Sequence, residues 1–335
     1  MTASTKTTIG LKLARLPEGT LRPEHIEKTL INLPDKPSLL LRPRYIGVDP
    51  YMRTRMQPAG YDYIERWAAG SPLSSWTLAE VIASNSPSFK RGDFVVGHLP
   101  MQEIVASDGQ HLIPVPEGND SEAYLHPLGM TGFTAWVGMQ LLGRPTANDT
   151  VLVSAAAGAV GSIAAQLARR QGAHVIVTAG RADKRAWLRD RGFQSVLNHR
   201  SPDYIEQLHD AAPFGITLDF ENIGGSAFTA AIESMATNGR IVLCGLVSQY
   251  QTHNPRKSPD NFAQLRQKNV AVHPFVVPDH LQYWDEFQCF MAPLVAHKSI
   301  EWQLDKVTGG LDSVAPALIG LLNGDNLGKR VVEMP

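Results

Sequence analysis

The sequence predicts an α/β protein that combines a β-rich domain with a domain built on a doubly wound parallel sheet. Residues 1–125 contain many prolines and short runs of β-type residues, separated by turn signals such as KRGD and SDGQ. From residue 150 onward, strand-like runs alternate with helix-like segments, a pattern typical of βαβ units and a parallel sheet. The first pattern gives way to the second near residue 126, where we expect the domain boundary.

The expected elements follow in chain order. The first domain, 1–125, should hold strands in SLLLRPRYIGV, LAEVIAS, DFVVGHL, EIVAS and LIPVP. The second domain, 126–295, should open with a helix over 127–142 and continue with strands in TVLVSA, HVIVTAG, SVLNH, ITLDFEN and RIVLCGLV, with helices between them. Residues 296–335 contain an apolar helix and a closing strand, KRVVEM, and we expect this segment to return to the first domain.

The composition argues against several classes of function. The formal net charge is −1, with 31 basic and 32 acidic residues, so no excess of charge points to nucleic acid or an anionic membrane. The two cysteines, Cys244 and Cys289, are too few for a disulfide framework or a structural zinc site. The N-terminus lacks an apolar signal-peptide core, and the run 151–168 is too short and too weakly apolar for a membrane span, so we expect a cytoplasmic protein.

An almost bare loop, SAAAGAVG at 154–161, follows the first strand of the second domain and opens a helix. It fits the dinucleotide fingerprint G-x-G-x-x-G, with Ala156 in the first glycine position. Gly158 lets the backbone approach a pyrophosphate, and Gly161 lets the helix pack tightly on the sheet. The alternative is a tight helix-packing turn without a ligand. The backbone expected to hold the pyrophosphate is that of Ala157, Gly158, Ala159 and Val160.

The end of the next strand predicts which nicotinamide cofactor binds. An NAD site usually carries an acidic residue there, about 20 residues into the motif, to bind the ribose 2′-hydroxyl. Here the strand ends in Thr178-Ala179-Gly180, and the cations Arg181 and Lys184 follow. Because a cation can neutralise a 2′-phosphate, the sequence favours NADPH. The alternative is that both cations only occupy a solvated helix start.

The residues also favour hydride transfer without a metal. A zinc alcohol dehydrogenase needs a set of Cys or His ligands, but neither cysteine lies in a ligand group and the eleven histidines form no H-E-x-x-H or similar pattern. A site without metal cannot easily polarise an isolated alcohol. Hydride addition to Cβ of a conjugated carbonyl, however, forms an enolate whose oxygen a few hydrogen-bond donors can stabilise. The cofactor supplies the hydride, and the protein aligns it.

The chain resembles the zinc-independent medium-chain dehydrogenase/reductases, and within them the 2-alkenal reductase branch. This branch includes leukotriene 12-hydroxydehydrogenase/15-oxoprostaglandin 13-reductase and bacterial curcumin reductase. The resemblance covers nearly the whole chain and rests on IGVDPYMR, LGMTGFTAW, VSAAAGAVGSIAAQLA, AGRADKRAWL, ENIGG, GRIVLCGLVSQY and GLLNGDNLGK. It implies a GroES-like β domain, a Rossmann domain, NADPH, no zinc and a homodimer. The implied reaction is reduction of the carbon–carbon double bond of an α,β-unsaturated aldehyde or ketone.

The resemblance also assigns roles by position. Lys184 becomes the ligand of the 2′-phosphate, and Tyr51 of DPYMR faces the substrate. The remaining implied cofactor residues are Thr134, Gly180, Cys244, Gly245, Ser248, Asn326 and Gly328. The chain departs from its relatives after the third strand: they usually carry Tyr-Lys, and this chain has His199-Arg200. The His199 imidazole could still stack on the cofactor or donate to its phosphate, in a way that would depend on pH. The chain also lacks the paired glycines expected within 70–81, where Trp76 could reshape the substrate pocket, and a tyrosine expected near Gln267.

Several candidates have two interpretations. Tyr51 could donate to the enolate oxygen or deliver a proton to Cα, or it could only cover a core edge. Tyr250 could form a second wall of the substrate pocket, or be an exposed loop aromatic. Asn222 lies at the end of the fourth strand, where open sheets bind ligands, but it could equally form a turn. For Cys244, the interpretation as a small buried residue is favoured over a role as a nucleophile.

Three functions remain open at this point. The first is an NADPH-dependent reductase of enals and enones. The second is a quinone reductase of the same superfamily. The third belongs to a different class: an NADPH-binding protein of low turnover whose shape regulates a partner.

Overall fold

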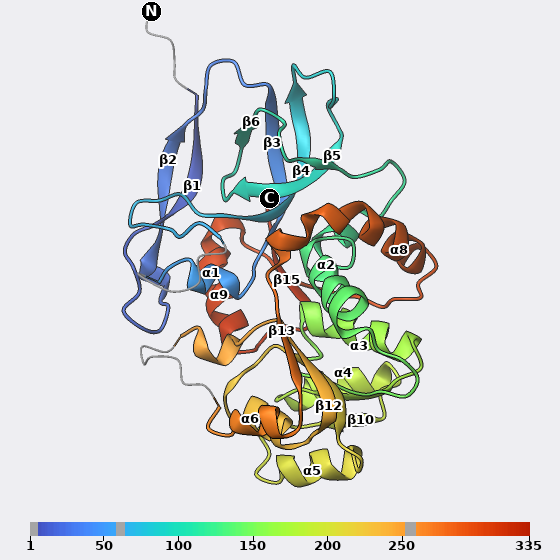
Figure 1. Ribbon diagram of the computed structural model, residues 1–335. Coiled ribbons are helices and arrows are strands. Elements are labelled where there is room, and N and C mark those ends of the chain that lie inside the picture. Colours follow the sequence, from blue (N-terminus) through green and yellow to red (C-terminus); the bar gives the residue numbers. More distant parts are fainter. Residues whose placement is uncertain (1–5, 58–63, 252–258) are drawn as a thin grey trace, which may run out of the picture. The chain divides into compact units, whose positions relative to one another are not determined.

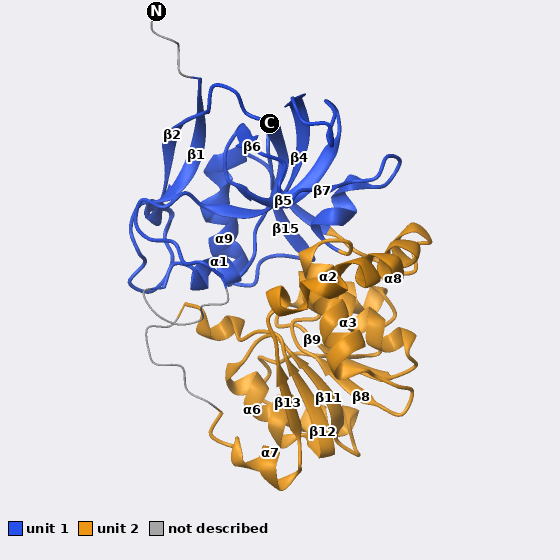
Figure 2. Cartoon of the chain, turned by 45° about the horizontal axis from the view of Figure 1, so that its top comes forward, with its two compact units in different colours: residues 1–126, 304–335 blue, residues 127–303 orange. Residues whose placement is uncertain are grey.

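The computed structural model describes residues 6–57, 64–251 and 259–335. The chain forms two compact units, shown in different colours in Figure 2. Unit 1 comprises residues 1–126 and 304–335, and unit 2 comprises residues 127–303. The closing segment of the chain therefore belongs to unit 1.

Unit 1 is rich in β-strands. Its described strands are β1 (Thr7–Leu13), β2 (Ile26–Asn32), β3 (Leu39–Gly47), β4 (Ser74–Ser84), β5 (Phe94–Pro100), β6 (Val105–Ser107), β7 (Ile113–Pro114), β14 (Leu304–Val307) and β15 (Lys329–Glu333). β1 and β2 form an antiparallel pair, and the others form a sheet in the order β14-β15-β3-β4-β5-β7, with β6 on β3. Within this sheet β15 pairs antiparallel with β3, with Val331 opposite Gly47, so the last strand completes a sheet begun early in the chain.

The helices of unit 1 are short, and one of them carries a predicted site residue. The described helical segments are η1 (Pro23–His25), α1 (Tyr51–Thr54), η2 (Ser121–Leu125), η6 (Gly310–Ser313) and α9 (Val314–Leu322). The apolar face of α9 packs into a core with β1, β3 and α1, in which Leu13, Ile46, Met52 and Leu318 are almost fully buried. This packing fixes the position of α1, whose first residue is Tyr51.

Unit 2 contains a parallel sheet of six strands in the described chain. These are β8 (Thr150–Val153), β9 (His174–Thr178), β10 (Ser195–Leu197), β11 (Ile216–Glu221), β12 (Met235–Leu243) and β13 (Ala271–Pro274). Their order is β10-β9-β8-β11-β12-β13, which is the doubly wound order of dinucleotide-binding domains. Figure 1 labels β10, β12 and β13 of this sheet. The order reverses between β8 and β11, and loops that follow strands at such a point form the usual ligand site of an open sheet.

Helices lie on both faces of this sheet. The described helical segments are α2 (Met130–Trp136), the π-helix η3 (Val137–Gly143), α3 (Ala159–Arg170), α4 (Ala182–Asp190), α5 (Tyr204–Ala211), α6 (Gly225–Glu233), η4 (Val247–Gln249), α7 (Ala263–Gln267), η5 (Val277–Tyr283) and α8 (Trp284–Ala296). Helix α2 packs on α3, whereas α5 and α7 pack on α6. The predicted fold class, a β-rich domain with a doubly wound parallel-sheet domain, is confirmed.

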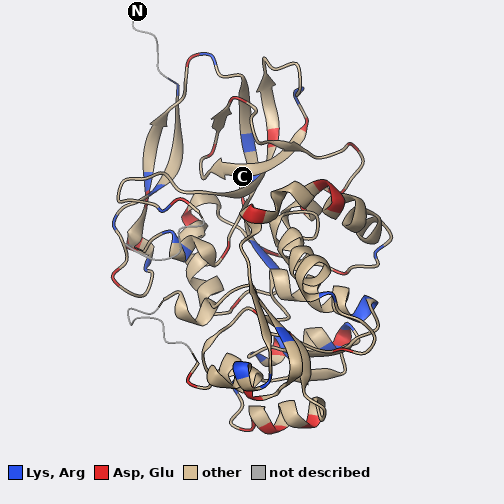
Figure 3. Cartoon of the chain, in the orientation of Figure 1, with Lys and Arg blue, Asp and Glu red and all other residues tan. Residues whose placement is uncertain are grey.

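The edge of the unit 2 sheet where the strands begin is held by a structural ion pair. Arg240 of β12 makes two contacts with the carboxylate of Asp149, at 2.9 and 3.1 Å, and the Thr217 hydroxyl donates to the same carboxylate at 2.7 Å. Lys and Arg, as well as Asp and Glu, are spread over both units (Figure 3). No helix in the described part of the chain has both the length and the apolar character that a membrane span requires.

Candidate functional site

The glycine loop of unit 2 connects β8 to α3, as its pattern predicts. Gly158 directly precedes α3 and has an extended backbone, with φ −90° and ψ 175°. A Cβ atom at Gly158 would approach only the Ala155 carbonyl oxygen, at 3.2 Å. A Cβ atom at Gly161 would lie 2.5 Å from that oxygen and 2.9 Å from the Cα of Ala156. Gly161 is therefore required by packing, whereas the absence of a side chain at Gly158 mainly leaves space beside the helix N-terminus.

The loops after three neighbouring strands are tied together beside this turn. The backbone N–H of Asn222, after β11, donates to the Ser154 hydroxyl at 2.7 Å, and its side-chain amide donates to the Ser154 carbonyl at 2.8 Å. After β12, the N–H of Ser248 donates to the Ile223 carbonyl at 2.9 Å. A Cβ atom at Gly245 would lie 3.4 Å from the Tyr250 hydroxyl. The structure thus brings Asn222, Gly245, Ser248 and Tyr250 to one edge of the sheet, with the loop that carries Ala157 and with Ala159 and Val160 at the start of α3.

A buried carboxyl group organises the second of these loops. Glu221, the last residue of β11, is fully buried, and its Oε1 accepts hydrogen bonds from the backbone N–H groups of Ile223, at 2.7 Å, and of Gly224. Burial raises the pKa of Glu221 to about 7, although these donors lower it. Burial, and then the charge of Glu221, raises the pKa of the Cys244 thiol to about 12. Cys244 therefore stays a thiol at neutral pH, which does not suit a nucleophile.

Positive charge gathers at the ends of β9 and β10. Arg185 donates to the carbonyl oxygen of Gly180 at 2.8 Å, and a Cβ atom at Gly180 would lie only 2.6 Å from Nε of Arg200. Burial lowers the pKa of His199 to about 4, and the charges that lower it further belong to Arg200, Lys184 and Arg185. The buried Nδ1 atom of His199 has no hydrogen-bond partner among the described residues. Such a cluster around a neutral imidazole is suited to an anionic group such as a phosphate.

Arg181 is engaged differently. Its guanidinium makes a two-point contact with the Asp183 carboxylate, with Nε–Oδ1 at 3.0 Å and Nη2–Oδ2 at 2.9 Å. Both residues lie at the start of α4, so Arg181 is already paired with a carboxylate in this structure. Thr134 of α2 donates its hydroxyl to the Met130 carbonyl at 2.7 Å.

Four further predicted residues lie in unit 1. Tyr51 begins α1, and its hydroxyl is 3.3 Å from Nε2 of His98. Trp76 of β4 is only 7% exposed, and its indole N–H donates to the Tyr124 carbonyl at 2.9 Å, so little of the ring faces solvent. The remaining two stand before β15: the Asn326 amide donates to the carbonyl of Gly328 at 2.9 Å, and Gly328 has a φ of 73°.

A buried ion pair fixes the turn before Tyr51. Nζ of Lys329, the first residue of β15, contacts Oδ1 of Asp49 at 2.5 Å and the carbonyl oxygen of Val48 at 3.3 Å. The side chains of Lys329 and Asp49 are 1% and 11% exposed. The two sequence motifs that contain Tyr51 and Asn326 are therefore joined inside unit 1.

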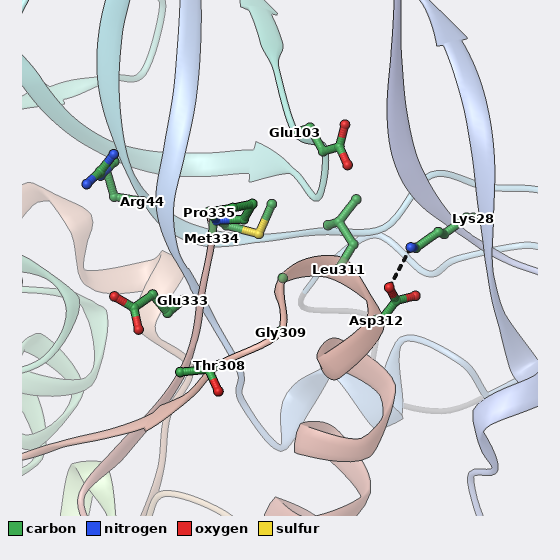
Figure 4. A pocket seen from close by; sticks show the side chains of 11 residues that line it. Lys28, Arg44, Glu103, Thr308, Gly309, Leu311, Asp312, Glu333, Met334 and Pro335 are labelled. Carbon is green, nitrogen blue, oxygen red and sulfur yellow. Dashed lines mark hydrogen bonds and ion pairs between the residues drawn. The ribbon is translucent and has the colours of Figure 1, made fainter.

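Unit 1 also has a surface hollow of about 620 Å³, lined by residues 308–312 and 333–335 with Lys28, Arg44 and Glu103. The ion pair between Lys28 and Asp312, at 2.7 Å, crosses one side of it (Figure 4). None of the predicted site residues lines this hollow, so we do not assign it to the reaction. Among the residues that the structure describes, no group of three or more His, Cys, Asp or Glu side chains is placed to hold a metal ion.

Sequence reasoning missed several residues that shape the site. Glu221, Ser154, Arg185 and His98 were not among the candidates, although Glu221 stands in the ENIGG motif. In this motif Glu221 is followed, after two residues, by two glycines. That pattern could have indicated that the carboxyl group accepts hydrogen bonds from the N–H groups of the loop.

Comparison with known proteins defines the class. Residues 10–115 match the family described as the N-terminal domain of oxidoreductase, and residues 159–296 match the family described as zinc-binding dehydrogenase. The chain is 34% identical over 331 residues to an NADPH-dependent curcumin reductase of Escherichia coli, covering 96% of this chain and 95% of that protein. It is 33% identical to a 2-alkenal reductase (NADP(+)-dependent) of Nicotiana tabacum, covering 86% of this chain and 84% of that protein.

A solved structure agrees with these relatives. The crystal structure of CurA from Vibrio vulnificus in complex with NADPH matches with a TM-score of 0.91 and 34% identity, covering 98% of this chain and 99% of that chain. The chain therefore belongs to the medium-chain dehydrogenase/reductases, as its motifs indicate. Within them it groups with the curcumin and 2-alkenal reductases, and it is an oxidoreductase.

Proposed function

We propose that this protein is an NADPH-dependent reductase of the carbon–carbon double bond of α,β-unsaturated aldehydes and ketones. The observation that carries the proposal is the similarity, over nearly the whole chain, to relatives named curcumin reductase and 2-alkenal reductase. Other relatives are named (+)-pulegone reductase and prostaglandin reductase 1.

The residues of unit 2 fit NADPH. The open space at Gly158 and the N-terminus of α3 suit the pyrophosphate, because backbone N–H groups and the helix dipole attract anions. Lys184 and Arg200 suit the 2′-phosphate, together with Nδ1 of His199, which has no hydrogen-bond partner in the described part of the chain. The loops with Asn222 and Ser248 stand at the point where the strand order reverses, where the nicotinamide half of a dinucleotide is expected.

When bound, NADPH supplies the hydride that adds to Cβ of the substrate. The electron pair of the carbon–carbon double bond then forms a double bond between Cα and the carbonyl carbon, and the electron pair of the C=O bond moves to the oxygen, so negative charge develops on that oxygen. We propose that the Tyr51 hydroxyl donates to this enolate oxygen, because a positioned donor stabilises charge that develops in the transition state. A proton from Tyr51 or from water then completes the saturated carbonyl at Cα. Tyr250 and Trp76 remain proposals for the substrate wall.

Two alternatives remain. A quinone reductase of the same superfamily would use the same cofactor site with another acceptor. A regulatory NADPH-binding protein would bind the cofactor tightly but turn over slowly. We also propose a homodimer and a cytoplasmic location; the two free thiols, Cys244 and Cys289, fit a reducing compartment.

The test is NADPH oxidation by the purified chain with a panel of short 2-alkenals, long conjugated enones and quinones, with mass spectrometry of the products. We expect saturated aldehydes or ketones, and an unchanged rate after treatment with a chelator, because the proposed chemistry uses no metal. Turnover of quinones alone would favour the first alternative. Tight NADPH binding without turnover of any acceptor would favour the second.

A further inference from the structure

The turn that carries Tyr51 lies beside a chain of polar contacts inside unit 1. The Tyr51 hydroxyl oxygen is 3.3 Å from Nε2 of His98 on β5, and the same Nε2 is 3.5 Å from Nη1 of Arg55, which directly follows α1. Nη1 of Arg55 also donates to the Ser74 hydroxyl at 3.2 Å. We call Tyr51, His98 and Arg55 the tyrosine triad.

The donor and acceptor roles in the triad follow from the guanidinium. Arg55 carries only N–H donors, so the nitrogen of His98 that faces it must present its lone pair. Nε2 is therefore the acceptor, and the ring proton of the neutral imidazole sits on Nδ1. Because the Tyr51 hydroxyl faces the same lone pair, the hydroxyl donates to it.

Arg55 is held firmly enough to impose this arrangement. It is 5% exposed, and its Nε donates to the carbonyl oxygen of Glu65 at 2.7 Å. Its Cζ lies 4.1 Å from the centre of the Trp67 ring, a cation–π contact. A planar guanidinium fixed by several partners loses little further freedom when it makes one more contact.

The same surroundings keep the His98 ring neutral, although part of it is exposed to solvent. Loss of water around the ring, and then the charge of Arg55, lowers the pKa of His98 to about 4, while Asp49 acts weakly in the other direction. Two other titratable side chains, Lys36 and Asp108, line a surface hollow of about 520 Å³ together with His98. The acceptor is therefore present throughout the neutral pH range.

We propose that His98, fixed by Arg55, is a positioning residue that holds the Tyr51 hydroxyl ready to donate to the substrate oxygen. This role rests on the enone reduction proposed above. At rest the hydroxyl donates to Nε2 over a long contact. When negative charge develops on the substrate oxygen, the hydroxyl rotates about its C–O bond and donates to that oxygen instead, because a charged acceptor makes the stronger hydrogen bond.

The experiment combines His98→Leu, His98→Gln and Tyr51→Phe, with His209→Leu on the exposed face of α5 as the control. We expect His98→Leu to lower kcat for an enone about tenfold, the size of one hydrogen bond, while KM for NADPH stays within about twofold. In His98→Gln the new side chain offers an amide oxygen near the position of Nε2, so this variant should recover most of the rate. His209→Leu should change neither constant. Thermal unfolding of each variant identifies any loss of folding.

The double variant separates positioning from a general structural effect. If His98 acts through Tyr51, adding His98→Leu to Tyr51→Phe should cause no further loss of kcat, because the hydroxyl it positions is already absent. Losses that multiply in the double variant would overturn the proposal, as would an unchanged kcat in His98→Leu.

A second readout does not depend on turnover. In protein with ¹⁵N-labelled histidine, we expect His98 in the Nδ1–H form at neutral pH, and a shift of its Nε2 resonance in Tyr51→Phe. A protein that reduces no enone but shows both signals would refute the proposed reaction and leave the triad intact. A protonated Nε2, or a resonance that ignores Tyr51→Phe, would refute the triad.

Discussion

The buried ion pair between Lys329 and Asp49 makes a quantitative prediction about stability. The Lys329→Met variant removes the ammonium group but keeps most of the side-chain volume. The Asp49 side chain, 11% exposed, then loses its charged partner while it stays buried. Breaking such a pair by removing one partner costs about 3–5 kcal/mol, because an uncompensated charge remains in the interior. At roughly 2–4 °C per kcal/mol, the thermal unfolding midpoint of unit 1 should fall by about 6–20 °C.

The assay is thermal or urea unfolding followed by circular dichroism, with a double-mutant cycle. Asp49→Asn in the Lys329→Met background should restore most of the loss, because the unpaired charge is gone. Lys306→Met is the matched control: its pair with Glu122, at 2.7 Å, has side chains that are 39% and 29% exposed, so it should cost less than about 1 kcal/mol. The reasoning is refuted if Lys329→Met is as stable as this control, or if the two single losses simply add.

Three further predictions concern unit 2. Gly161→Ala should destabilise the protein by about 1–3 kcal/mol in urea unfolding, because its Cβ would lie 2.5 Å from the backbone oxygen of Ala155. Gly158→Ala should leave stability nearly unchanged but lower the affinity for NADPH, measured by fluorescence titration. Lys184→Ala should lower the affinity for NADPH about 10–100-fold, because a charge-assisted hydrogen bond to the 2′-phosphate is lost, and should change the affinity for NADH little. Equal losses for both cofactors would contradict the assignment of Lys184 to the 2′-phosphate. Burial raises the pKa of Glu221 and of the neighbouring buried Asp219, so the folded state holds these protons more tightly than the unfolded state, and stability should fall as pH rises from about 4.5 toward neutrality. Glu221→Gln should reduce that fall; an unchanged pH profile would contradict the raised pKa.

The fold and the glycine loop could be predicted because their signals are local. The strand Thr150–Val153 is a short apolar run, the helix from Ala159 is continuous, and the bare loop between them has the spacing that a dinucleotide demands. The family motifs extended this reasoning to the cofactor. Such patterns can be recognised in a sequence because each lies within about twenty consecutive residues.

The contacts that shape the sites could not be predicted in this way. Asp49 and Lys329 are 280 residues apart in the chain, and Tyr51 and His98 are 47 apart. Each pair meets only because particular strands lie in a particular register, and no spacing rule records that. Trp76 illustrates the converse: the sequence shows an aromatic residue there, but only the structure shows that the ring is mostly buried with its N–H on the Tyr124 carbonyl.

The pairing of β15 with β3 also determines the order in which the two units can fold during synthesis. Unit 2 is continuous in the chain, so all of its strands are synthesised before residues 304–335. Unit 1, in contrast, must wait with the Tyr45–Gly47 end of one β3 edge unpaired until Val331 and Val332 arrive, although β6 can already pair with the Leu39–Leu41 end. An unpaired strand edge is prone to join other chains, so shortening the chain by its last few residues should leave an aggregation-prone intermediate rather than a slightly weaker enzyme.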